Sequence, residues 1–156
     1  MQTLVLGLGN PILRDDGVGN RIVQVLQKKI HNSNVTVLET NAIGLGLLDS
    51  LPGYNRAIII DAIQTPKGKA GQIHRLSLQD SAALDYLSTT HNIGLGTVIE
   101  LGNKLGLALP KEIIIIAIEV ADVTTFSEDL TPRVEQAIPK VVELVLQEIR
   151  DNESPN

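Results

Sequence analysis

The chain has 156 residues, a formal net charge of −5 and only two tyrosines and one phenylalanine as aromatic residues, which argues against a phosphate-tracking or base-stacking surface for nucleic acid. Hydrophobic residues make up 43% of the chain, enough for a globular core, but the longest apolar run covers only residues 113–118, far below the ~20 residues that span a bilayer. The N-terminus lacks a signal-peptide pattern and the chain has no cysteine, so we expect a cytoplasmic protein without disulfides, thiolate chemistry or a membrane partner.

The first half of the chain alternates apolar runs with helical patterns. A strand is predicted at about residues 2–7, and a glycine-containing loop leads from it into an amphipathic helix over about 16–30. A second strand is expected over 35–38, followed by a short helix over 43–51. The third strand, 57–62, is rich in β-branched residues without polar alternation, which indicates burial on both faces of a parallel sheet.

The connection after the third strand determines the direction of the fourth. A strand is predicted at about 72–78, and the link before it is shorter than the dozen or more residues that a parallel crossover needs. The fourth strand is therefore expected to run antiparallel to the third. A possible short helix at 80–87 and a helix at 94–105 then lead to a fifth strand over 112–119.

The last helix is expected to begin at Thr131, a good N-cap residue followed by proline, and to run to about residue 149 with a kink at Pro139. The alternation of strands and helices predicts an α/β fold of the phosphorylase/hydrolase-like type. Its three-layer α/β/α sandwich contains a five-stranded, mostly parallel sheet with strand 4 antiparallel. Residues 1–150 are predicted to form a single domain and residues 151–156 a flexible tail.

Two common types of site fit this sequence poorly. Gly7-Leu8-Gly9 after the first strand imitates part of a dinucleotide-binding fingerprint, but Ile12 occupies the third glycine position and Pro11 removes an N–H group from the phosphate cradle. The chain also lacks the Gly-x-Ser-x-Gly motif of a serine hydrolase. A nucleotide site and a hydrolytic serine triad are therefore disfavoured.

A metal site is a third candidate, formed by Asp16, Asp61 and His91. The first and third strands are expected to be parallel, so Asp16 at the start of a helix and Asp61 at the end of a strand emerge at the same sheet edge. Two ionised carboxylates ~4 Å apart repel by about 4 kcal/mol, and a divalent cation reverses that repulsion. Two oxygens and one nitrogen suit nickel, zinc or manganese and leave positions open for a substrate.

Simpler roles for the same three residues stay open at this stage. Asp16 can cap a helix, Asp61 can be a polar residue at a strand end, and His91 can lie at the surface or cap the next helix. Of the other polar residues, His74 lies in a strand pattern without an acidic neighbour in the sequence. Glu119 ends the fifth strand, where carboxylates are usually solvated.

Five short motifs follow one another over nearly the whole chain. They are Gly7-Leu8-Gly9-Asn10, Asp15-Asp16-Gly17-Val18-Gly19, Ile60-Asp61-Ala62, His91 with Gly94-Leu95, and Leu130-Thr131-Pro132. This ordered set resembles the [NiFe]-hydrogenase maturation endopeptidases. These proteases remove the C-terminal extension of the hydrogenase large-subunit precursor after nickel insertion. The resemblance implies a five-stranded sheet whose fourth strand is antiparallel.

The resemblance also assigns roles to the candidate site. It implies that Asp16, Asp61 and His91 are the metal-contacting and catalytic residues, that the nickel arrives with the substrate, and that a precursor without nickel is left uncut. His91 must be neutral to bind a metal ion, so activity is expected to fall as the pH drops through roughly 6.5. Many members carry an acidic residue and Gly-Gly-Thr after the second strand. This chain has Glu39-Thr40-Asn41-Ala42 there instead. The resemblance therefore leaves open which hydrogenase the protein processes.

Two alternatives remain beside the protease. The start Gly-Leu-Gly-Asn-Pro is also similar to that of peptidyl-tRNA hydrolases, which are esterases, but the Thr-Arg-His-Asn segment of that family is absent and the chain is acidic. A non-catalytic nickel-sensing or scaffold module for hydrogenase assembly is the second alternative, because the sequence offers no evident nucleophile or general base.

Overall fold

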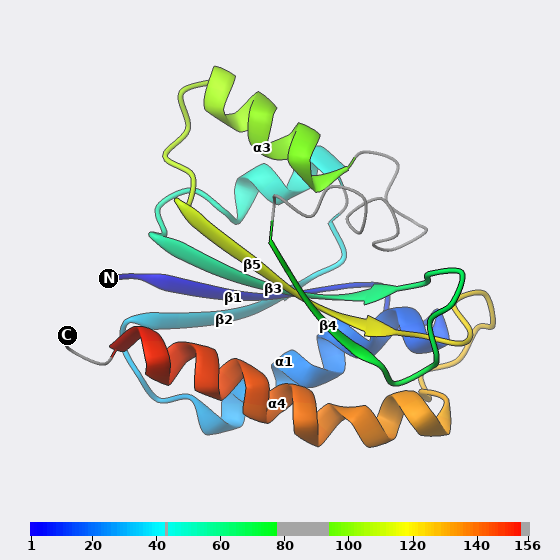
Figure 1. Ribbon diagram of the computed structural model, residues 1–156. Coiled ribbons are helices and arrows are strands. Elements are labelled where there is room, and N and C mark those ends of the chain that lie inside the picture. Colours follow the sequence, from blue (N-terminus) through cyan, green and yellow to red (C-terminus); the bar gives the residue numbers. More distant parts are fainter. Residues whose placement is uncertain (43, 78–93, 154–156) are drawn as a thin grey trace.

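One mixed sheet forms the centre of the computed structural model, which describes residues 1–42, 44–77 and 94–153 (Figure 1). Its spatial order is β2-β1-β3-β5-β4. β2, β1, β3 and β5 are parallel to one another, and β4 is antiparallel to β5. The predicted mostly parallel, five-stranded sheet with an antiparallel fourth strand is confirmed. The strands are β1 (Thr3–Leu8), β2 (Val35–Thr40), β3 (Arg56–Ile63), β4 (Ile73–Ser77) and β5 (Glu112–Glu119).

β4 runs in the predicted direction, antiparallel to β3, but the strand that it pairs with is β5. Residues 64–72 link β3 to β4, too short a segment for a parallel crossover. β5 then enters between the two strands and pairs with both, so that Ala117 lies opposite Asp61 on one side and His74 on the other. The link length determines the direction of a strand, whereas its neighbour depends on where a later strand is inserted.

Helices cover both faces of the sheet, which confirms the three-layer arrangement. In Figure 1, α1 and α4 lie on one face, while the 3-10 helix η2 and α3 lie on the other. The central strands are buried on both sides, as their β-branched composition predicts. The helices are α1 (Val18–Lys29), η2 (Gly44–Asp49), α3 (Leu95–Lys104) and α4 (Pro132–Glu153).

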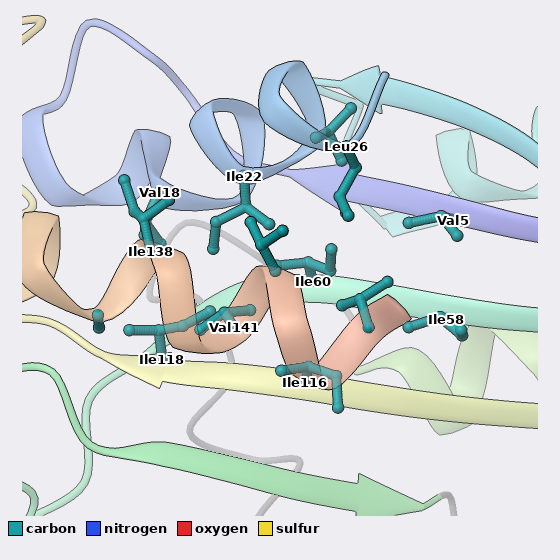
Figure 2. Close-up of a cluster of buried hydrophobic side chains, with 14 of the residues drawn as sticks. Val5, Val18, Ile22, Leu26, Ile58, Ile60, Ile116, Ile118, Ile138 and Val141 are labelled. Carbon is teal, nitrogen blue, oxygen red and sulfur yellow. The ribbon is translucent and has the colours of Figure 1, made fainter. Parts of the chain in front are cut away.

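Alternation along β3 divides its side chains between two cores. Ile58 and Ile60 pack toward α1 and α4, in the cluster that Figure 2 shows with Ile22 of α1 and Val141 of α4. Ile59 belongs to the second cluster, which includes residues of α3. Because successive strand residues point to opposite faces, Asp61 is directed to the η2 and α3 side of the sheet.

Two helical segments in the first half of the chain differ from the predicted ones. The segment 14–17 forms a separate 3-10 helix, η1 (Arg14–Gly17), and α1 begins only at Val18. The expected short helix over 43–51 is the 3-10 helix η2, and the expected helix at 80–87 lies outside the described residues. None of the described helices combines the length and apolarity that crossing a membrane requires.

α4 continues without interruption through Pro139 and ends at Glu153. A proline inside a helix removes one backbone hydrogen bond, and the apolar stripe that α4 buries, including Val141 and Val145, compensates for that loss. Residues 151–153, expected in a flexible tail, belong to the last turn of this helix. The helix is thus longer than the sequence pattern indicated.

Candidate active site

The loop between β1 and α1 carries Asp16 and is shaped by glycine. Gly9 has φ of +149°, and a Cβ atom there would lie 2.0 Å from the carbonyl oxygen of Asp16. A Cβ atom on Gly7 would lie 2.4 Å from the carbonyl oxygen of Gly19. Any side chain at these two positions would push the end of β1 away from η1 and α1. The glycines therefore bring Asp16 against the carboxyl end of the first strand.

Asp16 is fully buried, and its Oδ2 accepts a hydrogen bond from the Asn10 backbone N–H at 2.9 Å. The alternative role of Asp16 as a helix cap is wrong, because α1 begins after Gly17 without a side-chain cap. Both acids lie in the preceding 3-10 turn, which directs their carboxylates toward neighbouring loops. Asp16 is thus held in the interior by the loop that it closes.

Asp61 lies within β3 and is 1% exposed. Burial raises the pKa of its carboxyl well above the ordinary value. A hydrogen bond from the Ala62 N–H to Oδ1, at 2.8 Å, opposes this rise, and the negative charge of Asp16 adds to it. The charge of Asp16 therefore contributes to the raised pKa of Asp61, and a shared site of the two acids at this sheet edge stays a prediction. A buried acid whose pKa is strongly raised is a common feature of functional sites.

His91, the third predicted member of the site, lies outside the described residues. Among residues 1–42, 44–77 and 94–153, no three histidine or acidic side chains are grouped in a way that would hold a metal ion. Asp16 and Asp61 are the two members of the predicted site that the structure describes. The assignment of His91 stays a prediction.

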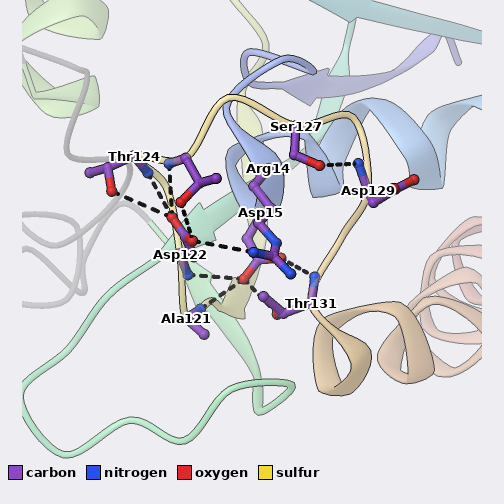
Figure 3. Close-up of polar contacts among 9 residues, drawn as sticks. Arg14, Asp15, Ala121, Asp122, Thr124, Ser127, Asp129 and Thr131 are labelled. Carbon is purple, nitrogen blue, oxygen red and sulfur yellow. Dashed lines mark hydrogen bonds and ion pairs between the residues drawn. The ribbon is translucent and has the colours of Figure 1, made fainter.

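Asp15 joins the loop before α1 to the loop after β5 (Figure 3). Its buried carboxylate accepts hydrogen bonds from the backbone N–H groups of Ala121, Asp122 and Thr131, at 3.0, 3.1 and 2.7 Å. The Thr131 hydroxyl donates a fourth bond at 2.7 Å. Sequence reasoning missed this role, because the donors lie more than a hundred positions away along the chain. The aspartate immediately before Asp16 therefore fixes the position of the loop that carries Asp16.

Asp122 stabilises a tight turn in the loop after β5. Hydrogen bonds from the Thr125 hydroxyl and from the backbone N–H groups of Thr124 and Thr125 lower the pKa of the Asp122 carboxyl to about 2, and the nearby Arg14 guanidinium lowers it further. An aspartate that accepts bonds from residues two and three positions ahead fixes a tight turn.

Two further polar residues differ from expectation. His74 has an acidic neighbour in space, since its Nε2 lies 3.1 Å from Oε1 of Glu119. Glu119 is buried rather than solvated, with 2% of its side chain exposed, and it also accepts hydrogen bonds from the N–H and hydroxyl groups of Thr65. A Cβ atom on Gly68 would lie 2.0 Å from the Glu119 carboxyl carbon, so any side chain there would have to displace this hydrogen-bonded carboxylate. Glu119 thus holds the β3–β4 link in place.

Glu39 lies at the end of β2, directed away from Asp61. Its Oε2 accepts a hydrogen bond at 3.1 Å from the side-chain amide of Gln24 in α1. Val37, two residues earlier on the same side of the strand, packs against the α1 and α4 core. Glu39 therefore belongs to the face opposite that of Asp61, and its side chain is exposed.

The fold agrees with comparisons to known proteins. A sequence model described as hydrogenase maturation protease matches residues 20–148. The chain is 30% identical to the hydrogenase 2 maturation protease of Escherichia coli K12 over 154 residues, which cover 97% of this chain and 93% of that protein.

Solved structures show the same similarity. The hydrogenase maturating endopeptidase HybD from E. coli superimposes with a TM-score of 0.86 at 30% identity, covering 98% of this chain and 94% of that one. The [NiFe] hydrogenase maturation protease HybD from Thermococcus kodakarensis has a TM-score of 0.69 at 26% identity, with 94% and 98% covered. The class of protein is thus an α/β protease. The chain belongs to the hydrogenase maturation protease family, which confirms the resemblance stated from the motifs and favours an enzyme over a non-catalytic module.

Proposed function

We propose that this protease removes the C-terminal extension of a [NiFe]-hydrogenase large-subunit precursor after nickel insertion, in the cytoplasm. We further propose that Asp16, Asp61 and His91 contact the nickel ion that the precursor carries. The observation that supports this most directly is the pair of buried, electrostatically interacting carboxylates on η1 and β3, in a chain of this family.

The chemistry of the acid pair supports recognition of a cation. Burial and the charge of Asp16 both make ionisation of Asp61 unfavourable in the protein alone. A divalent ion presented by the substrate offsets both effects, because it attracts each carboxylate and reverses their mutual repulsion. A precursor without nickel offers no such compensation, so cleavage is restricted to the loaded substrate. In this proposal nickel belongs to the substrate and is not a resident cofactor.

The proposal is tested by mixing the purified protein with nickel-loaded and nickel-free precursor and measuring the mass of the large subunit. We expect shortening of the loaded precursor only. Asp16→Asn, Asp61→Asn and His91→Ala are expected to abolish the shortening, whereas Asp129→Asn, which changes an exposed aspartate near the same loops, is expected to retain it. Trimming by Asp16→Asn at the wild-type rate would refute the role of this pair. A stable complex without loss of mass would refute the proposed reaction.

A further inference from the structure

His74 and Glu119 form a polar pair that the proposed function does not use. The pair joins β4 to β5, with His74 Nε2 3.1 Å from Glu119 Oε1. Glu119 is buried, whereas 26% of the His74 side chain is exposed. The carboxylate therefore fixes one nitrogen of the ring in the interior while part of the ring stays open to solvent. A histidine held in this way by a buried carboxylate is a typical arrangement for proton transfer.

The pair lies on the same face of the sheet as Asp61. In the strand register, Asp61 is opposite Ala117 on β5, and Ala117 is opposite His74 on β4. Residues opposite one another direct their side chains to the same face, and neighbouring strands are ~4.8 Å apart, so the Cα atoms of Asp61 and His74 are about 10 Å apart. Glu119 follows Ala117 by two positions and shares this face. The contact with Glu119 draws the His74 ring over β5, toward the strand that carries Asp61.

The contacts of the Glu119 carboxylate determine which nitrogen of His74 carries the proton. The other groups at this carboxylate, the N–H and the hydroxyl of Thr65, both donate hydrogen bonds to it. The carboxylate thus acts as an acceptor, and we assign the proton of neutral His74 to Nε2. This assignment leaves the lone pair of the ring on Nδ1, where a proton can be taken up.

Peptide cleavage requires a group of this kind. A water must lose a proton as it attacks the scissile carbonyl carbon, and the leaving nitrogen must gain one. The chain has no cysteine and no Gly-x-Ser-x-Gly motif, and in the proposed function Asp16 and Asp61 contact nickel. Of the two histidines that the structure describes, His31 is exposed between the end of α1 and the start of β2, at the amino ends of the parallel strands. His74 is therefore the described imidazole that can act beside Asp61.

We propose that His74 transfers the protons during peptide-bond cleavage and that Glu119 is its positioning residue. This inference rests on the proposed function. Nδ1 of His74 takes a proton from the water whose oxygen bonds to the scissile carbonyl carbon, and then gives that proton to the leaving nitrogen as the C–N bond breaks. One water is consumed, and a carboxyl group and an amine are formed. Glu119 stays ionised and stabilises the imidazolium that exists between the two transfers.

His74→Gln separates proton transfer from structural support, because its amide keeps an N–H donor for Glu119 but does not take up a proton. Initial rates of cleavage are measured against the concentration of nickel-loaded precursor. We expect kcat to fall by about 100-fold or more, with KM and Tm unchanged. His31→Gln makes the same chemical change at the exposed histidine and is expected to retain the wild-type kcat.

The role of Glu119 is tested in two backgrounds. Glu119→Gln is expected to lower kcat by about tenfold or more in the wild-type chain, because the ring loses its orientation and its counter-charge. In the His74→Gln chain the same substitution should leave kcat nearly unchanged, since no proton transfer remains to be supported. A structural role of Glu119 would lower activity equally in both backgrounds, and that result would overturn its positioning role.

The outcomes separate this inference from the proposed function. A kcat for His74→Gln equal to that of His31→Gln, or a change in KM alone, would overturn the role of His74 while the cleavage reaction stands. If His74→Gln lowers Tm, His74→Gly assayed with added imidazole decides instead: recovery of the rate supports the inference, and no recovery overturns it. If the wild-type protein leaves the loaded precursor uncut, the proposed function fails and the inference fails with it. That result differs from cleavage by the wild type and His74→Gln alike.

Discussion

Asp15 is the carboxylate that joins the two loops around the candidate site, and we expect Asp15→Asn to lower the free energy of unfolding by about 3–5 kcal/mol. The substitution keeps the size and shape of the side chain but replaces one acceptor oxygen with an NH₂ group. All four groups that contact this side chain are donors: the N–H groups of Ala121 and Asp122, and the N–H and hydroxyl groups of Thr131.

The magnitude follows from these contacts. Oδ1 accepts one of the four bonds and Oδ2 accepts three, so the best orientation of the amide turns its NH₂ group toward the Thr131 N–H. A buried donor left without an acceptor costs about 1–3 kcal/mol. The three remaining bonds lose the assistance of the negative charge, which makes each weaker by roughly 0.5–1 kcal/mol. For a protein of this length the loss corresponds to a fall in Tm of roughly 10 °C.

Urea unfolding followed by circular dichroism measures this difference, with Asp129→Asn as the control because it makes the same chemical change at an exposed position in the adjoining loop. The control is expected to stay within about 0.5 kcal/mol of the wild-type protein. A loss for Asp15→Asn that is no larger than the loss for Asp129→Asn would refute the reasoning that Asp15 holds the loops together.

Three further predictions concern single residues. The Asp122 carboxyl, with its pKa lowered to about 2, stays ionised down to that pH. Its stabilising effect is complete above the ordinary value of 3.8 and is lost as the pH falls toward 2, so a carboxyl NMR titration should give a midpoint near 2, whereas a midpoint near 4 would contradict the turn. The raised pKa of Asp61 makes the folded protein bind more protons than the unfolded chain above pH 3.8, so stability falls as the pH rises through that window. Asp61→Asn should flatten this fall in thermal unfolding scans, and an unchanged slope would count against the shift. Gly68→Ala places a Cβ atom against the buried carboxylate of Glu119 and should cost about 1–3 kcal/mol in urea unfolding, whereas Gly96→Ala, where the added methyl meets open space, should cost nothing; equal effects would disprove the close packing.

The central sheet could be predicted because its signals are local. The uninterrupted apolar residues of β3 and β5 identify strands buried on both faces, and the short segment 64–72 determines the reversed direction of β4. Parallel β1 and β3 were enough to expect Asp16 and Asp61 at one edge of the sheet. What failed was the detail at helix ends, because a 3-10 turn and a helix start share the same sequence pattern.

The amino-acid sequence by itself determined the strands, the three layers and the motifs that define the family. Only the tertiary structure decided which distant groups meet: Asp15 with donors more than a hundred positions away, His74 with Glu119, and Leu13 with Ser127. The physical reason is that periodicity and propensity report on neighbours a few residues apart. Contacts between the loops at a sheet edge depend instead on strand order and register, which become fixed when the whole sheet packs.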